Sequence, residues 1–258
     1  MKKFLIAAVA VLGATGAHAD AVPYSNWTGL YAGVNVGGVW QNSDQSLVVG
    51  PGTTLVNPVD RAAVGAAGTG GNDRTNFIGG GQIGYNRQAV GSVWVWGVEA
   101  DFSGIANGRN ARSATAPFPS TPALNFTVTT SSGYDWLLTA RGRVGYAFDK
   151  SLVYVTGGLA VAELKASSAY VDGGVPPGVG ASSSSVTKAG WTVGAGWEYA
   201  VAPSWTVKAE YLYLHFDGVG GNYPILAPGF TANLASYNST FNDNHITRVG
   251  LNHKLTNY

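Results

Sequence analysis

The sequence predicts an all-β protein, an antiparallel up-and-down barrel that crosses a membrane with eight strands. Three observations support this fold. Apolar residues alternate with small or polar ones at a period of two, as in strands with two different faces. Charged residues make up only 11% of the chain, where a soluble domain has about 25%. Finally, short and long connections follow one another between the alternating segments, as in transmembrane barrels.

The first 19 residues have the features of a secretory signal peptide. Lys2 and Lys3 precede the apolar run 4–12, and Ala17-His18-Ala19 is an A-x-A cleavage site. The run is too short to span about 30 Å of hydrocarbon as a helix. We divide the chain into a signal peptide (1–19), a short periplasmic segment (20–26) and a barrel domain (27–258). Loss of Lys2 and Lys3 changes the net charge from +1 to −1.

The first four alternating segments are 29–40, 77–87, 94–103 and 136–146. Their apolar faces carry, in order, Leu30, Val34, Val36 and Trp40; Ile83 and Tyr85; Trp94, Trp96, Val98 and Phe102; and Trp136, Leu138, Val144 and Tyr146. Between these positions stand Gly, Asn, Gln, Thr or a charged residue. Since successive side chains of a strand point to opposite faces, each segment is predicted to be a strand with one apolar face.

The last four segments are 153–161, 191–199, 205–213 and 248–255. Their apolar faces carry Val153, Val155, Leu159 and Val161; Trp191, Val193, Trp197 and Tyr199; Trp205, Val207, Tyr211 and Tyr213; and Val249, Leu251 and Leu255. Short turns are predicted near 88–91, 148–151 and 200–204. The other four connections are predicted to be long extracellular loops of roughly 25 to 35 residues, rich in Gly, Ser, Thr, Pro and Asn.

The polar faces of these strands carry few charges, and acids balance bases. The acids are Glu99, Asp101, Glu198 and Glu210, and the bases are Arg141, Arg143, Lys208 and Arg248. Because an eight-stranded barrel has an interior just wide enough for side chains to fill, we predict that they form a neutral ion-pair network in the lumen. Glu99 and Asp101 should lie near Arg141 and Arg143, while Lys208 and Glu210 should reach Glu198 or Arg248. A secreted β-sandwich is the competing fold, but its water-facing side would carry many more charged residues.

Aromatic residues on the apolar faces predict girdles at the two membrane interfaces. The predicted girdle residues are Trp40, Trp94, Trp96, Trp136, Tyr146, Trp191, Trp197, Trp205 and Tyr213. The stretch 79–84 satisfies G-x-G-x-x-G, but it lies inside an alternating strand and not between a strand and a helix. Packing in a narrow lumen explains these glycines better than nucleotide binding.

Five strand sequences resemble the small porin-like outer-membrane proteins of alphaproteobacteria. They are 27–33 (WTGLYAG), 95–101 (VWGVEAD), 140–146 (ARGRVGY), 190–198 (GWTVGAGWE) and 207–213 (VKAEYLY). The resemblance implies an eight-stranded OmpA-type barrel in the outer membrane, inserted by the outer-membrane assembly machinery. Family members end in V-G-L-N-Y-K-F, whereas this chain reads VGLNHKL at 249–255 and has its final aromatic residue at Tyr258.

The expected function is a structural or surface role in the outer membrane, with weak porin-like permeation of small solutes. The alternative is a surface receptor or adhesin that acts through the long loops. Some relatives bind haem, so the resemblance makes His215 and His245 candidate haem ligands at the extracellular rim; solvated rim residues are the competing interpretation. We expect no enzymatic activity, since no nucleophile and base are grouped, and neither a metal site nor a resident cofactor. The near-neutral charge argues against nucleic acid as a partner, and the absence of Cys excludes disulfides.

Overall fold

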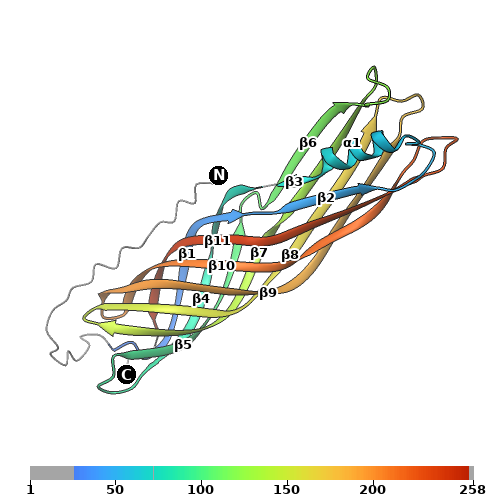
Figure 1. Cartoon of the computed structure of the whole chain (residues 1–258). Helices are drawn as coiled ribbons and strands as arrows, with labels where there is room; N and C mark the ends of the chain where they lie inside the picture. Colours follow the sequence, from blue (N-terminus) through green and yellow to red (C-terminus); the bar gives the residue numbers. More distant parts are fainter. Residues whose placement is uncertain (1–25, 72, 256–258) are drawn as a thin grey trace.

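The computed structural model describes residues 26–71 and 73–255. In this part of the chain, one antiparallel sheet of eleven strands is accompanied by one helix, α1 (Pro58–Gly68) (Figure 1). The predicted signal peptide 1–19, most of the segment 20–26 and Tyr258 lie outside the described residues. Within the described ranges, no helix has the length and apolar character needed to cross a membrane.

The long strands close into a ring. Following hydrogen-bonded neighbours, the order is β1 (Gly29–Gln41), β4 (Arg74–Gln88), β5 (Trp94–Ile105), β7 (Asn125–Phe148), β8 (Ser151–Asp172), β9 (Val179–Ala202), β10 (Trp205–Ile225) and β11 (Asn233–Lys254), and β11 pairs again with β1. Every one of these pairings is antiparallel. The prediction of an all-β antiparallel barrel is therefore confirmed.

Short turns join the strands at the end of the barrel where β11 ends (Figure 1). Residues 89–93 connect β4 to β5, Asp149 and Lys150 connect β7 to β8, and Pro203 and Ser204 connect β9 to β10. Asp149 has a φ of 47°, a left-handed conformation that Asp tolerates better than most residues. These turns lie where the alternation predicts them.

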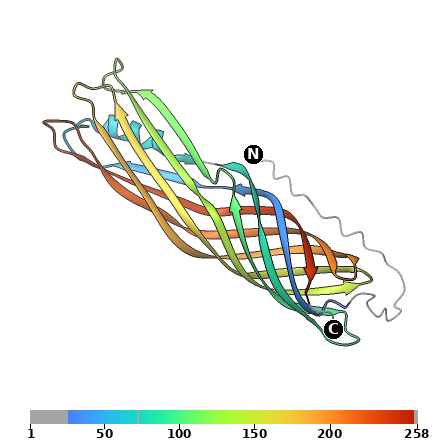
Figure 2. The same ribbon diagram turned by 180° about the vertical axis from the view of Figure 1, so that it is seen from behind.

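The prediction that the long connections are loops is wrong for much of their length. β8 continues to Asp172 and β9 starts at Val179, well beyond the predicted ends at 161 and 191. The sheet also contains β2 (Asp44–Val49), β3 (Gly70–Gly71) and β6 (Arg109–Pro117), which the alternation does not predict. We call residues 42–73, 106–135, 162–190 and 216–244 the extension; it stands opposite the short turns (Figures 1 and 2).

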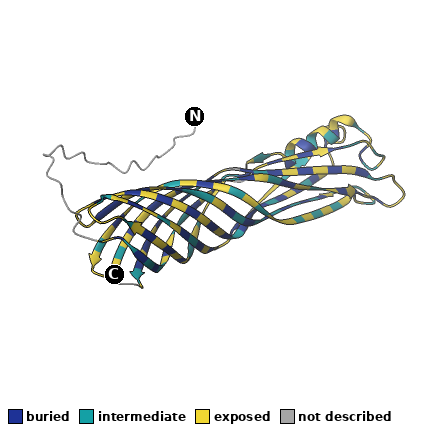
Figure 3. Ribbon diagram, turned by 90° about the horizontal axis from the view of Figure 1, so that it is seen from below, coloured by how far each residue is buried: buried dark blue, intermediate teal, exposed yellow. Residues whose placement is uncertain are grey.

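The two halves of the molecule place their apolar residues on opposite sides of the sheet. On β8, Val155 and Leu159 are exposed near the short turns, while Leu164 and Tyr170 are buried in the extension. Exposed apolar residues of β8 therefore have odd numbers near the short turns, whereas buried apolar residues have even numbers in the extension. The change does not come from a bulge between β8 and β9, because their register is regular throughout. A barrel wall in lipid exposes apolar residues, whereas a sheet in water buries them, so the reversal marks where the surroundings change. Figure 3 shows the alternation of buried and exposed residues along the ring.

The extension has an apolar core, which is continuous with buried apolar residues of the adjoining barrel interior. Phe126 of β7, Tyr170 of β8 and Tyr237 of β11 are each at most 3% exposed within it. The α1 helix covers one side: Asn57 caps its first turn by accepting a hydrogen bond from the Val59 N–H, and Val64 is fully buried. The extension is thus a folded part of the sheet and not a set of irregular loops.

Candidate functional site

The barrel interior near the short turns contains a cluster of buried charged side chains. Each of them is 4% exposed or less: Glu99 and Asp101 on β5, Arg141 and Arg143 on β7, Glu198 on β9, Lys208 and Glu210 on β10, and Arg248 on β11. They alternate along their strands with exposed residues such as Val98 and Val144. The structure therefore brings together in one lumen all the charged residues for which the sequence predicts that position. We call this set the lumen network.

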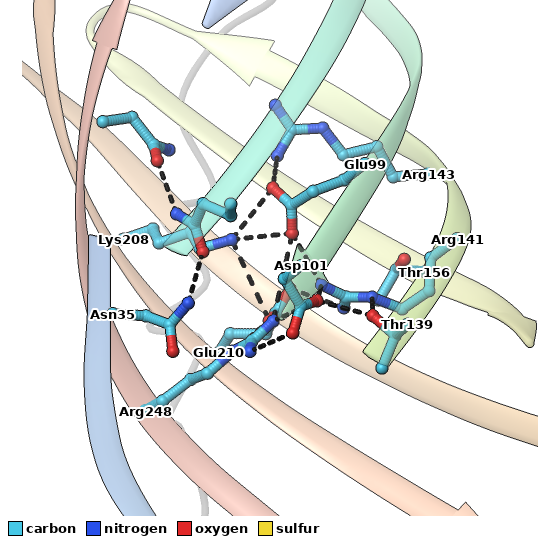
Figure 4. A network of polar contacts seen from close by, with 12 residues as sticks. Asn35, Glu99, Asp101, Thr139, Arg141, Arg143, Thr156, Lys208, Glu210 and Arg248 are labelled. Atoms are coloured by element: carbon cyan, nitrogen blue, oxygen red, sulfur yellow. Dashed lines mark hydrogen bonds and ion pairs between the residues drawn. The ribbon is translucent and has the colours of Figure 1, made fainter. Parts of the chain in front are cut away.

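Arg141 contacts three carboxylates of the lumen network (Figure 4). Its guanidinium nitrogens lie 2.6 Å from Glu99 Oε1, 2.9 Å from Asp101 Oδ2 and 3.0 Å from Glu210 Oε1. Arg248, on β11 at the opposite side of the ring, donates to the same Asp101 at 2.9 Å and lies 2.7 Å from Glu210 Oε2. Two guanidinium groups and three carboxylates thus share their hydrogen bonds, which satisfies most of their polar atoms without water.

Lys208 differs from the sequence prediction. Its Cα is paired with that of Glu198, yet its Nζ donates to Glu99 at 2.8 Å, across the lumen. The carboxylate of Glu198 accepts instead from Arg143, Thr206 and Asn252. The expected contact of Lys208 with Glu198 is therefore wrong, while the expected contact of Glu210 with Arg248 is present. The long lysine stem lets the ammonium group reach past its nearest neighbour to an acid on the opposite side of the lumen.

Arg143 forms a second layer, closer to the short turns. Its guanidinium carbon lies 4.8 Å from the ring centroid of Tyr31 and 5.0 Å from that of Tyr154, so the cation is held between two aromatic faces. Its Nε donates to Asn86 Oδ1 at 2.8 Å and its Nη1 to Glu198 Oε2 at 3.1 Å.

Sequence reasoning missed the neutral partners of the lumen network. Tyr31 donates to Glu99 at 2.7 Å, Tyr154 donates to Glu210 at 2.9 Å, and Thr139 donates to Asp101 at 2.5 Å. All three alternate with outward-facing residues and point into the barrel. This position in the alternation is the sequence signal that identifies them. They turn a set of ion pairs into a connected polar core.

A layer of apolar side chains closes the lumen between the lumen network and the extension. Its members have no measurable exposure and follow the charged positions on the same inward faces: Val39, Ile78, Leu137, Leu212 and Ile246. On β10 the inward order is Lys208, Glu210, Leu212 and Leu214, so the change from charged to apolar takes a single inward step. The lumen is thus filled first by the charged lumen network and then, toward the extension, by the apolar layer.

At the short-turn end, a recess of about 440 Å³ opens next to the lumen network. Trp27, Lys150 and Lys254 line its sides, and Tyr31 and Glu198, which belong to the packed interior, also line it. Lys254 donates to the Asn26 carbonyl at 3.0 Å. Tyr31 and Glu198, at the inner side of the recess, are hydrogen-bonded within the barrel interior.

The outer wall carries aromatic residues at two levels. Near the short turns, the exposed members are Trp94, Trp96, Tyr146, Trp197 and Trp205; near the extension they are Trp40 and Trp191, with Trp136 and Tyr213 partly buried. Rings within each level touch: the centroids of Trp94 and Tyr146 are 5.7 Å apart, and those of Trp191 and Tyr213 are 5.3 Å apart. Between the levels most outward residues are aliphatic, for example Val98 and Val155, with Tyr211 and Thr247 as exceptions.

The two candidate haem ligands lie on the outer wall at the aromatic level near the extension. His215 stacks on Trp191 with centroids 5.5 Å apart, and His245 Nδ1 lies 2.7 Å from the Tyr211 hydroxyl. Asp243 accepts a hydrogen bond from the Tyr213 hydroxyl at 3.0 Å. Across residues 26–71 and 73–255, no group of three or more His, Cys, Asp or Glu side chains is arranged to hold a metal ion.

A closed antiparallel barrel with an aliphatic outer band between two aromatic levels defines an integral outer-membrane barrel protein. Residues 5–251 match the outer membrane protein beta-barrel domain family, and the chain belongs to that family. The resemblance to alphaproteobacterial outer-membrane proteins is confirmed.

Two relatives show how far the similarity extends. The chain is 32% identical to the 31 kDa outer-membrane immunogenic protein of Brucella melitensis over 99% of its own length and 100% of the relative. It is 33% identical to the 22 kDa outer membrane protein of Rhizobium leguminosarum bv. viciae over 57% of each chain. Among solved structures, the outer membrane protein OprG of Pseudomonas aeruginosa is 10% identical, with a TM-score of 0.48, over 91% of this chain and 100% of that one.

Proposed function

We propose that this protein is a closed, non-enzymatic outer-membrane barrel whose eight ring strands span the bilayer and hold the folded extension at the cell surface. The observation that carries the proposal is the filled lumen. The lumen network and the apolar layer occupy the interior in series, and each charged side chain in it is paired. A porin-like path through the barrel would require both the lumen network and the apolar layer to be displaced. Permeation of solutes is therefore at most a minor activity in this proposal.

The proposal assigns the partners by chemistry. Lipid surrounds the aliphatic band between the aromatic levels, and the outer-membrane assembly machinery inserts the barrel. Nucleic acid is not a partner. The receptor or adhesin function is the second candidate, and the observation that favours it is the extension itself, since a folded sheet with a buried apolar core presents a defined surface where flexible loops would not.

Cysteine labelling in whole cells tests the proposed orientation. The chain contains no Cys, so Val175→Cys at the far end of the extension and Val90→Cys in a short turn each give one thiol at a fully exposed position. With a membrane-impermeant maleimide, we expect Val175→Cys to react on intact cells and Val90→Cys to react only after lysis. The opposite pattern, or equal labelling of both before lysis, would contradict surface display of the extension.

A further inference from the structure

The far end of the extension has an unusual charge distribution. No Asp, Glu, Lys or Arg occurs in 173–187 or in 218–242. These stretches include the connection from β8 to β9 and the connection from β10 to β11, which stand together at the end of the molecule opposite the short turns (Figure 1). A water-facing surface normally carries many charged residues, so this end differs from an ordinary solvated one.

Apolar side chains are exposed at this same end. Six of them, 46% to 99% exposed, form what we call the apolar tip: Val171, Val175, Val179, Leu226, Phe230 and Leu234. Val171 pairs with Val179, and Val179 forms a bridge with Leu226, so these three make one row across the strands. Val175 and Phe230 lie in the two connections beyond that row. An apolar patch of this kind on a water-facing surface marks a contact site.

The charged residues that flank the apolar tip are already bound inside the protein. Asp172 accepts hydrogen bonds from the Tyr170 hydroxyl at 2.7 Å and from the Gly174 and Gly178 amides at 2.9 Å each. Burial, reinforced by Asp172, raises the pKa of the Tyr170 hydroxyl, which therefore remains a donor.

On the α1 side, the charged groups are hydrogen-bonded within the protein in the same way. Asp60 accepts from the backbone and hydroxyl of Ser120, and Arg61 donates to the carbonyls of Leu55 and Val56. A partner that covers the apolar tip would not have to remove water from a free charge, a step that is costly without a compensating bond.

We propose that the apolar tip inserts into the interface of an apposed, uncharged lipid bilayer. Protruding aliphatic and aromatic side chains without nearby free charge are what an interfacial membrane contact requires. The absence of basic residues from both stretches argues against attraction to anionic headgroups. Val175 and Phe230 lie on separate connections, and a fluid lipid surface can accept two such separate side chains. The inference rests on the proposed surface display and names the chemistry of the partner.

Vesicle binding tests this inference. The barrel is held in nanodiscs and mixed with sucrose-loaded vesicles of pure phosphatidylcholine, and the pelleted fraction is measured against lipid concentration, with empty nanodiscs as background. We expect the native protein to pellet, and we expect Val175→Ser combined with Phe230→Ser to weaken binding about tenfold or more, since two exposed apolar anchors are lost. Both sites are exposed, so heat-modifiable gel mobility should show folding unchanged.

The matched control is Val90→Ser, which removes an equally exposed valine at the opposite end of the molecule. It should bind vesicles like the native protein. The inference is overturned if the native protein does not pellet, if pelleting requires anionic lipid, or if Val90→Ser weakens binding as much as the double change. Normal cysteine labelling of Val175→Cys together with absent vesicle binding would reject the lipid partner and leave the proposed surface display intact.

Discussion

At the scale of single residues, the lumen network combines full burial with exact neutrality of charge. Four acids face four bases, and Arg141 contacts three of the acids at 3.0 Å or less. Removing one member of a buried group leaves the others uncompensated, which costs more than the intact group contributes. The network is therefore sensitive to the loss of any central member.

Arg141→Ala is expected to lower the free energy of unfolding by about 3–5 kcal/mol, because Glu99, Asp101 and Glu210 then share too few cations. Urea titration of the lipid-reconstituted protein, followed by gel mobility, measures the change. Arg109→Ala is the control, since that side chain is 61% exposed and lies 3.9 Å from its nearest acid; a shift of about 0.5 kcal/mol or less is expected there. Equal effects of the two changes would contradict a buried network.

Neighbouring glycines on β4 give a second residue-level prediction. A Cβ on Gly80 would lie 2.1 Å from the Phe102 carbonyl oxygen and 2.6 Å from the Ser103 Cα, whereas on Gly81 the nearest atom would be 3.8 Å away. Gly80→Ala should therefore destabilise the barrel by about 1–3 kcal/mol, as overpacking does, and Gly81→Ala should be tolerated. Thermal gel-shift midpoints compare the two, and a larger loss for Gly81→Ala would contradict the packing.

At the scale of elements, the sequence predicts the strands within the membrane band and misses their continuation. The period of two with an apolar outward face is plain in 153–161, but in the extension of β8 the outward face becomes polar and the inward one holds Leu164, Ser168 and Tyr170. A search for a lipid-facing strand stops where that pattern reverses. The partner of Lys208 is missed for a different reason, because pairing along the sheet does not say how far a flexible side chain reaches.

The extension should behave as ordered sheet in solution. Backbone amides of β8 in 162–171 pair with β7 and β9 on both sides, so we expect hydrogen exchange there to be slowed to a similar degree as in 152–160. The amide of Val175, in the connection beyond the strands, should exchange much faster. Hydrogen–deuterium exchange with peptide mass analysis provides the comparison, and rapid exchange throughout 162–171 would show that the long connections are flexible loops after all.

At the scale of the whole molecule, one sheet serves two surroundings. The part near the short turns exposes aliphatic residues between the aromatic levels and buries charged side chains. The extension does the reverse, because it buries Phe126 and Tyr237 and exposes polar residues. Inside the barrel, the side chains change from charged to apolar at about the level where the exposed residues of the outer wall change from apolar to polar. Under the proposed function, strands β7 to β11 run without a break from the membrane anchor into the surface domain, whereas β1, β4 and β5 do not extend into it, and the filled lumen is what separates the molecule from a channel.

Planar-bilayer recording on the purified protein tests the closed lumen most directly. An aqueous channel is found in barrels of about sixteen to eighteen strands, and such a porin, recorded under the same conditions, serves as the positive control. With the lumen network and the apolar layer in place, we predict no stable channel openings at moderate voltage. Stable, large conductance steps from the native protein would contradict the account.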